Sequence, residues 1–420
     1  MKIYAEKMGF STENSGSENS KILTELLRKY DDVEVAEKGV YSVAEAIEIG
    51  SNRCLSFAEG VFLKREKSNT ETSYVLINKG AYTRMYDENI TVCGLNIICN
   101  GVQSSNPTAK SKSVIAGLRG HIAFFYVKNL VIKNFTALDL PPKDFGIHIC
   151  TFYNILIEDV KIEGRKDAVH LGRGMNFVIR GGDFKTFDDP VALNAHDYAS
   201  SNPQLGWIEN GLIENCVDRD DSETTGFFCR ILAGSWCEWK KGMKIQNSDT
   251  VISNGRLYRA LMKPDDKIYE SLTAPAHEAG MQVIDGINWV FVQNEVFKNC
   301  GCKNITFKNI VIEKNRPVAF SMHFDNDNFS RSVYPGSAAP VQENITFENI
   351  KVSGNVPVFM YAVTPVSNIR VKDSDLGEGT IEISSLKNVG EYPIDNFAFE
   401  NTKVPEFAIA PGRKVTVEEK

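Results

Sequence analysis

The stretch Asp167-Ala-Val-His-Leu-Gly-Arg-Gly-Met-Asn-Phe-Val-Ile-Arg-Gly-Gly-Asp-Phe-Lys-Thr-Phe-Asp-Asp-Pro-Val-Ala-Leu-Asn-Ala-His-Asp-Tyr198 contains nearly the same phrase twice. Asp167-Ala-Val-His-Leu171 and Asp189-Pro-Val-Ala-Leu193 agree at their first, third and fifth residues, and 22 residues separate their starts. A short β-rich repeat near this length is typical of a solenoid. Residues in equivalent positions of stacked coils lie roughly 4.8 Å apart. The repeat therefore predicts that Asp167 and Asp189 are neighbours in space.

A third carboxylate, Asp188, directly precedes Asp189. Three carboxylates on one strip of surface repel one another, and such a cluster is more often a functional site than an accident. They cannot all ionise freely, so at least one should hold its proton near neutral pH. We expect Asp189 to be that group and to act as a general acid, while an ionised neighbour acts as the base.

A second phrase recurs from residue 88 onward: Asn, apolar, any, apolar, any, then Asn, Asp or Gly. It occupies residues 89–94, 129–134, 154–159, 176–181, 210–215, 304–309, 344–349, 368–373 and 396–401. The intervals between successive starts are 40, 25, 22, 34, 94, 40, 24 and 28 residues, so the short intervals are single coils and the long ones carry insertions. Alternation within each phrase is typical of a strand, and Asn at both ends suits left-handed corners and side-chain ladders. The pattern predicts an all-β, single-stranded, right-handed parallel β-helix.

The 94-residue interval contains three of the four tryptophans, Trp236, Trp239 and Trp289, and the dipeptide Asn254-Gly255 between two alternating stretches, which predicts a β-hairpin. We therefore divide the chain into residues 1–65, an N-terminal cap with a helix near 20–30; 66–235, the first part of the solenoid; 236–292, an inserted small β module; and 293–420, the C-terminal coils. The module resembles small β modules of the chitin-binding type. Its tryptophans would form a sugar-stacking lid or a core that serves folding alone.

Composition sets limits on partners and location. The chain has 420 residues and a formal net charge of −7, which argues against nucleic acid as a main partner. It contains no run of 18 apolar residues, so no membrane span is expected, and its first residues do not form the apolar segment of a signal peptide. Nine scattered cysteines fit reduced thiols. We expect a cytoplasmic protein, or a secreted one if a leader has been removed, that can form homo-oligomers.

Strand alternation sorts the residues near the carboxylates into inward and outward sets. Val169, Leu171 and their equivalents should face the core, so His148, His170 and Ala192 should stack on the outer face. The candidate substrate-binding residues are His148, His170, Asn194, His196 and Arg230.

Asp and His side chains together are also a set that can bind a divalent ion. The region has no closely spaced His pair, and residues 325–328, Asp-Asn-Asp-Asn, lack the Gly and terminal Glu of a calcium loop. We therefore expect neither a metal nor another cofactor.

Residues 120–198 resemble the central coils of the polygalacturonase-type glycoside hydrolases, family 28, within the pectate-lyase-like β-helix proteins. Lys166-Asp-Ala-Val-His-Leu171 resembles their Asn-Thr-Asp-Gly-Ile-Asp-Ile strand. Phe187-Asp-Asp-Pro-Val-Ala-Leu193 resembles their Gly-Asp-Asp-Cys-Ile-Ala-Ile strand. The resemblance implies that Asp167, Asp188 and Asp189 correspond to the three carboxylates of that family.

Two family motifs have no counterpart in the next coil, which reads Thr225-Gly-Phe-Phe-Cys-Arg-Ile-Leu-Ala-Gly234. The Gly-His-Gly motif is absent, and Arg230 is the residue that could replace the missing Arg-Ile-Lys in gripping a sugar carboxylate. The expected activity is thus a glycoside hydrolase that is exo-acting or specific for oligosaccharides. The alternatives are a polysaccharide lyase or uronate-modifying enzyme on the same scaffold, and a non-catalytic, carbohydrate-binding tailspike or adhesin.

Overall fold

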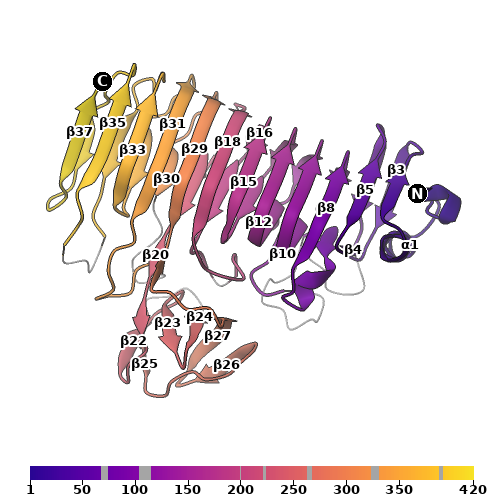
Figure 1. The fold of residues 1–420 in the computed structure, drawn as a ribbon, viewed down its shortest axis with the longest axis horizontal. Helices are drawn as coiled ribbons and strands as arrows, with labels where there is room; N and C mark the ends of the chain where they lie inside the picture. Colours follow the sequence, from indigo (N-terminus) through magenta and orange to yellow (C-terminus); the bar gives the residue numbers. More distant parts are fainter. Residues whose placement is uncertain are drawn as a thin grey trace.

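Strands stack coil upon coil along one long axis, with the two termini at opposite ends of the stack (Figure 1). The computed structural model describes residues 1–67, 74–103, 115–198, 200–220, 224–262, 267–322, 331–386 and 391–420. Residues 325–328, considered above as part of a calcium loop, lie outside these ranges. All pairings between neighbouring coils are parallel, for example β10 with β12 and β12 with β14. The predicted right-handed parallel β-helix is confirmed.

Each coil contributes to three sheets, which we number in the order in which the chain meets them around the site. Sheet 1 contains β4 (Ile47–Ile49), β7 (Leu76–Asn78), the first part of β10 (Gly120–Lys133) and of β12 (Phe145–Glu158), β14 (Val169–Leu171), β17 (Val191–Asn194), β19 (Cys229–Leu232), β30 (Val318–Met322), β32 (Val358–Ala362), β34 (Thr380–Ile383) and β36 (Phe407–Ile409).

Sheet 2 contains β1 (Lys2–Tyr4), β2 (Asp32–Val35), β5 (Arg53–Phe57), β8 (Asp87–Cys93), the second part of β10 and of β12, β15 (Gly174–Arg180), β18 (Ile208–Asp218), β29 (Cys302–Ile312), β31 (Gln342–Val352), β33 (Val366–Lys372), β35 (Asp395–Glu400) and β37 (Val415–Glu419). Sheet 3 contains β3 (Gly39–Val43), β6 (Val61–Arg65), β9 (Asn96–Ile98), β11 (Thr136–Leu140), β13 (Lys161–Gly164), β16 (Asp183–Thr186) and the ends of β18, β29 and β31.

The inward-facing residues of sheet 1 form the predicted apolar ladders. Ile147 is opposite Val169, Val169 is opposite Val191, and all three are completely buried. Because side chains alternate along a strand, this register sends His148, His170 and Ala192 to the other face, one above another. The order of the outward residues next to the carboxylates is therefore fixed by core packing.

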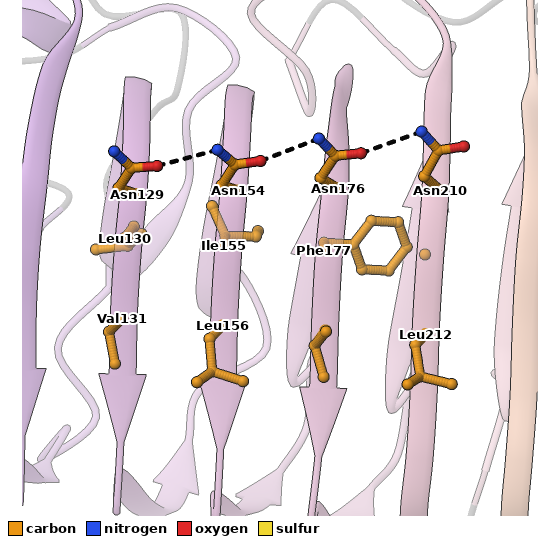
Figure 2. A pocket seen from close by; sticks show the side chains of 12 residues that line it. Asn129, Leu130, Val131, Asn154, Ile155, Leu156, Asn176, Phe177, Asn210 and Leu212 are labelled. Atoms are coloured by element: carbon orange, nitrogen blue, oxygen red, sulfur yellow. Dashed lines mark hydrogen bonds between the residues drawn. The ribbon is translucent and has the colours of Figure 1, made fainter.

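An asparagine ladder runs along the corner that leads into sheet 2 on successive coils (Figure 2). Asn129, Asn154, Asn176 and Asn210 all have positive φ values between 53° and 61°, which short polar side chains tolerate. Each amide donates to the preceding one, for example from Nδ2 of Asn154 to Oδ1 of Asn129 at 3.0 Å. Asn304 Nδ2 donates to Asn210 Oδ1 at 3.0 Å, so the ladder continues across the 94-residue interval. The insertion therefore leaves the stack without disturbing its register.

The N-terminal end is closed by helix α1 (Gly16–Lys29), which packs on β3 and β4. Ser15 accepts a hydrogen bond from the Glu18 N–H group and so caps the helix. Two short 3₁₀ helices, η1 (Glu6–Met8) and η2 (Lys79–Tyr82), complete the helical content of the described residues. In this part of the chain, no helix combines the length and apolar character required to cross a membrane.

The inserted module lies beside the solenoid in sheets of its own (Figure 1). β20 (Gly234–Ser235) and β28 (Asn299–Cys300) form an antiparallel pair at its base. Its other strands are β21 (Cys237–Glu238), β22 (Met243–Ile245), β23 (Thr250–Ser253), β24 (Arg256–Ala260), β25 (Tyr269–Ser271), β26 (Met281–Ile284) and β27 (Ile287–Gln293). β23 and β24 form the predicted hairpin, in which Asn254 and Gly255 both have positive φ.

Candidate active site

Asp167, Asp188 and Asp189 meet at the start of sheet 1, where β14 and β17 stack. One oxygen atom from each carboxylate lies within 4.8 Å of the others. The register that pairs Val169 with Val191 places Asp167 and Asp189 at equivalent points of successive coils. The predicted proximity is confirmed. The Asp167 and Asp189 side chains are almost completely buried, whereas the Asp188 side chain is 18% exposed.

Two cations lie among the three carboxylates of this cluster. The Lys166 ammonium contacts Asp188 and lies 3.3 Å from Oδ1 of Asp167. The Arg230 Nε atom lies 3.4 Å from Oδ2 of Asp189, so this predicted substrate-binding residue forms an ion pair with the cluster. Lys166 and Arg230 place two positive charges beside the three carboxylates and so lower the repulsion among them.

The environments of the two buried carboxylates move their pKa values in opposite directions. Burial, with a further contribution from the nearby Asp167 charge, raises the pKa of Asp189 to about 6, although Arg230 and the Phe227 N–H group oppose this. Burial also favours the neutral form of Asp167, but Lys166 and the hydrogen bond from His170 outweigh it and hold the pKa of Asp167 below its ordinary value. One carboxyl thus keeps a proton at mildly acidic pH while its neighbour is ionised.

His170 connects this pair to a further acidic residue. Its Nδ1 atom is 2.8 Å from Oδ2 of Asp167, and its Nε2 atom is 3.6 Å from Oδ2 of Asp197. The ring stacks on Phe145 with the centroids 4.0 Å apart. Asn194 Nδ2 donates to the same Asp197 oxygen at 2.7 Å. His170 and Asn194 therefore belong to one network behind the carboxylates.

The other two candidate histidines are completely enclosed. His148 accepts a hydrogen bond at Nδ1 from the Arg119 N–H group, and burial holds its pKa well below the ordinary value. His196 lies against the module, with Nε2 3.4 Å from Thr250 Oγ1, and burial lowers its pKa as well. The structure therefore brings His148 and His170 together at the carboxylates and places His196 at the boundary with the module.

A buried arginine of the module reaches the loop that covers this network. The Arg259 guanidinium donates to the main-chain oxygens of Asp197 and Asn202. Asn202 in turn donates from Nδ2 to the main-chain oxygen of Asn194 at 2.6 Å. The module thus fixes Asp197 and Asn202 beside the network of His170 and Asn194.

Sequence reasoning overlooked three residues of this arrangement: Lys166, Asp197 and Arg259. The 22-residue repeat could have identified Lys166, because it places that residue opposite Asp188. Asp197 and Arg259 meet through contacts that no repeat relates, since one lies in a loop and the other in the insertion.

Two of the three module tryptophans are enclosed by the protein, and the third, Trp239, is partly exposed. Trp236 and Trp289 are almost completely buried, and Trp239 donates from Nε1 to Ser271 Oγ at 2.8 Å. These contacts fit the alternative in which large aromatic residues support the folding of a small module.

No protein-family model and no curated protein matches the sequence. Solved structures do match. A family 28 exopolygalacturonase from Yersinia enterocolitica is 13% identical with a TM-score of 0.51, and the alignment covers 100% of this chain and 78% of that one. A mannuronan C-5 epimerase A-module from Azotobacter vinelandii has 9% identity, a TM-score of 0.49 and coverage of 99% of both chains. A surface adhesin of Streptococcus pneumoniae has 13% identity, a TM-score of 0.46 and coverage of 99% and 93%. The similarity to the exopolygalacturonase shows a shared β-helix fold.

Proposed function

We propose that this protein hydrolyses glycosidic bonds of oligosaccharides by carboxylate acid/base catalysis at Asp167, Asp188 and Asp189. One observation carries the proposal: two buried carboxylates with oxygen atoms within 4.8 Å have pKa values driven apart, with that of Asp189 raised to about 6. Pairs of titratable groups separated in this way are typical of acid/base catalysts.

In this mechanism, protonated Asp189 donates its proton to the glycosidic oxygen as the bond to the anomeric carbon breaks. Ionised Asp167, oriented by His170, accepts a proton from the attacking water. Asp188 is the most exposed of the three, so it is the carboxylate that a sugar in the site meets first. Because its side chain is the most accessible to a bound sugar, Asp188 is the second candidate for the proton donor.

The cations of the site support substrate binding. The side chains of Lys166 and Arg230 are 22% and 30% exposed, so each can pair with a carboxylate of the cluster and still face a ligand. A guanidinium binds a carboxylate or two neighbouring hydroxyl groups through parallel hydrogen bonds. This favours sugars that carry an acidic group, such as uronic acids.

The same two cations favour a second candidate, a lyase or other uronate-modifying reaction. Lys166 and Arg230 beside a uronate carboxylate would stabilise the negative charge that develops when the neighbouring C–H proton is removed. A lyase gives an unsaturated product that absorbs in the ultraviolet, whereas a hydrolase gives a new reducing end without such absorption.

The test is a screen of neutral and uronate oligosaccharides, followed by reducing-end and ultraviolet assays, with the Asp189→Asn protein as the blank. Hydrolysis predicts reducing ends that the wild type produces and the Asp189→Asn variant does not. Ultraviolet absorption would instead support the lyase. Turnover of no glycan by the wild type, under conditions in which it binds one, would contradict catalysis and support a binding protein.

A further inference from the structure

A second feature of the solenoid lies at the corner between sheets 1 and 2, away from the carboxylates. The register of sheet 2 aligns Asp87, Val127, Phe152, Gly174 and Ile208 on five successive coils. The residues that precede them therefore form a row along the corner: Tyr86, Tyr126, Thr151, Arg173 and Trp207. Stacked coils are roughly 4.8 Å apart, so side chains of this row follow one another along the axis.

This row borders two adjoining cavities of about 160 and 530 Å³. Arg173 and Glu295 line both of them, and their side chains form an ion pair of 2.5 Å. The smaller cavity is also lined by Tyr86, Tyr153, Trp207 and Phe297. Glu295 and Phe297 belong to the segment that returns from the module, so the walls come from two parts of the chain.

We propose that this corner groove, defined by Tyr86, Tyr153, Arg173, Trp207, Glu295 and Phe297, is a carbohydrate-binding site separate from the carboxylate cluster. Asp167 and Arg173 are six residues apart on one coil, at opposite ends of β14, so they are separated by at most roughly 20 Å. The groove does not depend on the proposed catalysis, because none of its residues belongs to the acid/base machinery.

Aromatic exposure is the first argument. Tyr86 and Tyr153 are each 36% exposed, and their ring centroids are 5.9 Å apart. Trp207 is half-buried. On the next coil the corner row continues with Gly301, and the indole ring lies close over it: a Cβ atom at Gly301 would be 3.3 Å from Cζ3 of Trp207. Rings with an apolar face and one wet edge bind the C–H face of a sugar. This set differs from Trp236 and Trp289, whose rings are enclosed by the protein.

Charge is the second argument. Lys128 Nζ is 4.4 Å from the Tyr86 centroid, and Lys303 Nζ is 5.1 Å from the Trp207 ring. Together with the Arg173–Glu295 pair, they provide donors and acceptors beside the aromatic faces. Hydroxyl groups of a pyranose chain require such a mixture, and the lysines extend it to sugars with a carboxylate.

Binding is measured on the Asp189→Asn protein, by calorimetric titration with neutral oligosaccharides in one arm and uronate oligosaccharides in the other. We expect Trp207→Ala to weaken binding roughly tenfold or more, because an aromatic contact face is lost. Arg173→Gln, which changes little volume, should weaken it in the same direction. Phe62→Ala is the matched control: Phe62 is also aromatic and 37% exposed but lies outside the groove, so its removal should leave affinity unchanged.

Stronger binding of the uronate arm assigns the groove to acidic glycans, and equal binding assigns it to neutral ones. If no oligosaccharide of either arm binds, or if Trp207→Ala and Arg173→Gln leave affinity unchanged, the corner groove is not a sugar site. Turnover distinguishes this result from failure of the proposed function, since neither substitution touches the carboxylates.

Discussion

The Nδ1 atom of His170 lies 2.8 Å from Oδ2 of Asp167, while its Nε2 atom faces Asp197 at 3.6 Å. An imidazole between two carboxylates has its orientation set at both nitrogens. This favours the ionised form of Asp167, whose pKa is held below its ordinary value by Lys166 and His170 in spite of burial. The relationship between His170 and Asp167 therefore separates the roles of Asp167 and Asp189.

Asp189→Asn should abolish turnover, with a loss of roughly 10²–10⁴-fold, because an amide cannot act as the general acid. Circular dichroism should show an unchanged fold. Asp183→Asn is the matched control, since this aspartate pairs with Arg219 outside the site and its loss should leave turnover unaltered. If both Asp189→Asn and Asp188→Asn keep near-wild-type turnover, the carboxylate mechanism is wrong.

Asp189→Asn should also change the stability of the protein in a pH-dependent way. The ordinary pKa of Asp is 3.8, and that of Asp189 is raised to about 6, chiefly by burial. Because the pKa of Asp189 is higher in the folded state than in the unfolded state, protonated Asp189 contributes its full stability at pH values below 3.8. This contribution is lost as the pH rises through about 6. Asp189→Asn should therefore raise the melting temperature relative to wild type at pH 7.5 but not at pH 4. A uniform shift at both pH values would show that ionisation is not the cause.

Arg230→Met should move the basic limb of the pH–rate profile to higher pH. The Arg230 charge lowers the pKa of Asp189 against the larger effect of burial, so its removal lets the general acid keep its proton longer. Arg219→Met, at an exposed ion pair outside the site, is the control and should leave the limb in place. A raised KM with an unchanged limb would instead mean that Arg230 acts on the substrate alone.

Gly226→Ala tests the site without changing any charge. A Cβ atom at this position would lie 2.5 Å from the Asp188 carbonyl carbon and 2.7 Å from Oδ1 of Asp189. The carboxylates must shift to accommodate it, and displacements of this kind strongly reduce turnover. Gly50→Ala, whose Cβ would have its nearest contact at 3.9 Å, should be silent. Equal activity of the two variants would contradict the importance of this geometry.

Arg259→Met should loosen residues 197–202, because it leaves the buried main-chain acceptors of Asp197 and Asn202 without their donor. Each orphaned acceptor costs about 1–3 kcal/mol. Hydrogen exchange of the 197–202 amides should accelerate, while exchange in β29 and β31 stays slow. Faster exchange throughout the solenoid would show that Arg259 supports global stability and not this loop.

Replacements of Asn176 separate two contributions of the corner ladder. Asn176→Gly should cost about 1 kcal/mol through lost amide hydrogen bonds to Asn154 and Asn210. Asn176→Ala should cost about 1 kcal/mol more, because φ at this position is 61° and Ala has no side chain to support it. Urea denaturation measures both. Equal stability of the two variants would rule out backbone strain as a factor.

The sequence predicted those features that the coil repeat encodes directly. Val169 and Val191 lie in the core, Asn154 and Asn176 adopt left-handed corners, and Asp167 meets Asp189, all because stacking converts a sequence interval into contact. Local turn chemistry likewise gave the hairpin between β23 and β24.

Contacts between the insertion and the solenoid were beyond this reasoning. Arg259 reaches Asp197 across 62 residues, and no periodicity relates the two. The pKa separation at Asp189 also depended on burial depth and on Phe227, Arg230 and Lys166 together, which alternation alone does not provide. The aromatic residues of the corner groove come from coils with insertions of different lengths. The sequence intervals therefore could not predict that Trp207 and Tyr153 line one cavity.

The hydrogen bond between Asn210 and Asn304 shows that the asparagine ladder continues across the insertion, which bears on how a β-helix tolerates inserted modules. Closing a loop of 94 residues instead of 22 costs only roughly 1 kcal/mol of additional chain entropy, because this cost grows with the logarithm of length. The antiparallel pair of β20 and β28 brings the two ends of the insertion together and shortens the effective loop. A β-helix can therefore accept a whole folded module at one corner with little loss of stability. In this protein the module also contributes Arg259, which binds the main chain of Asp197 and Asn202 beside the candidate active site.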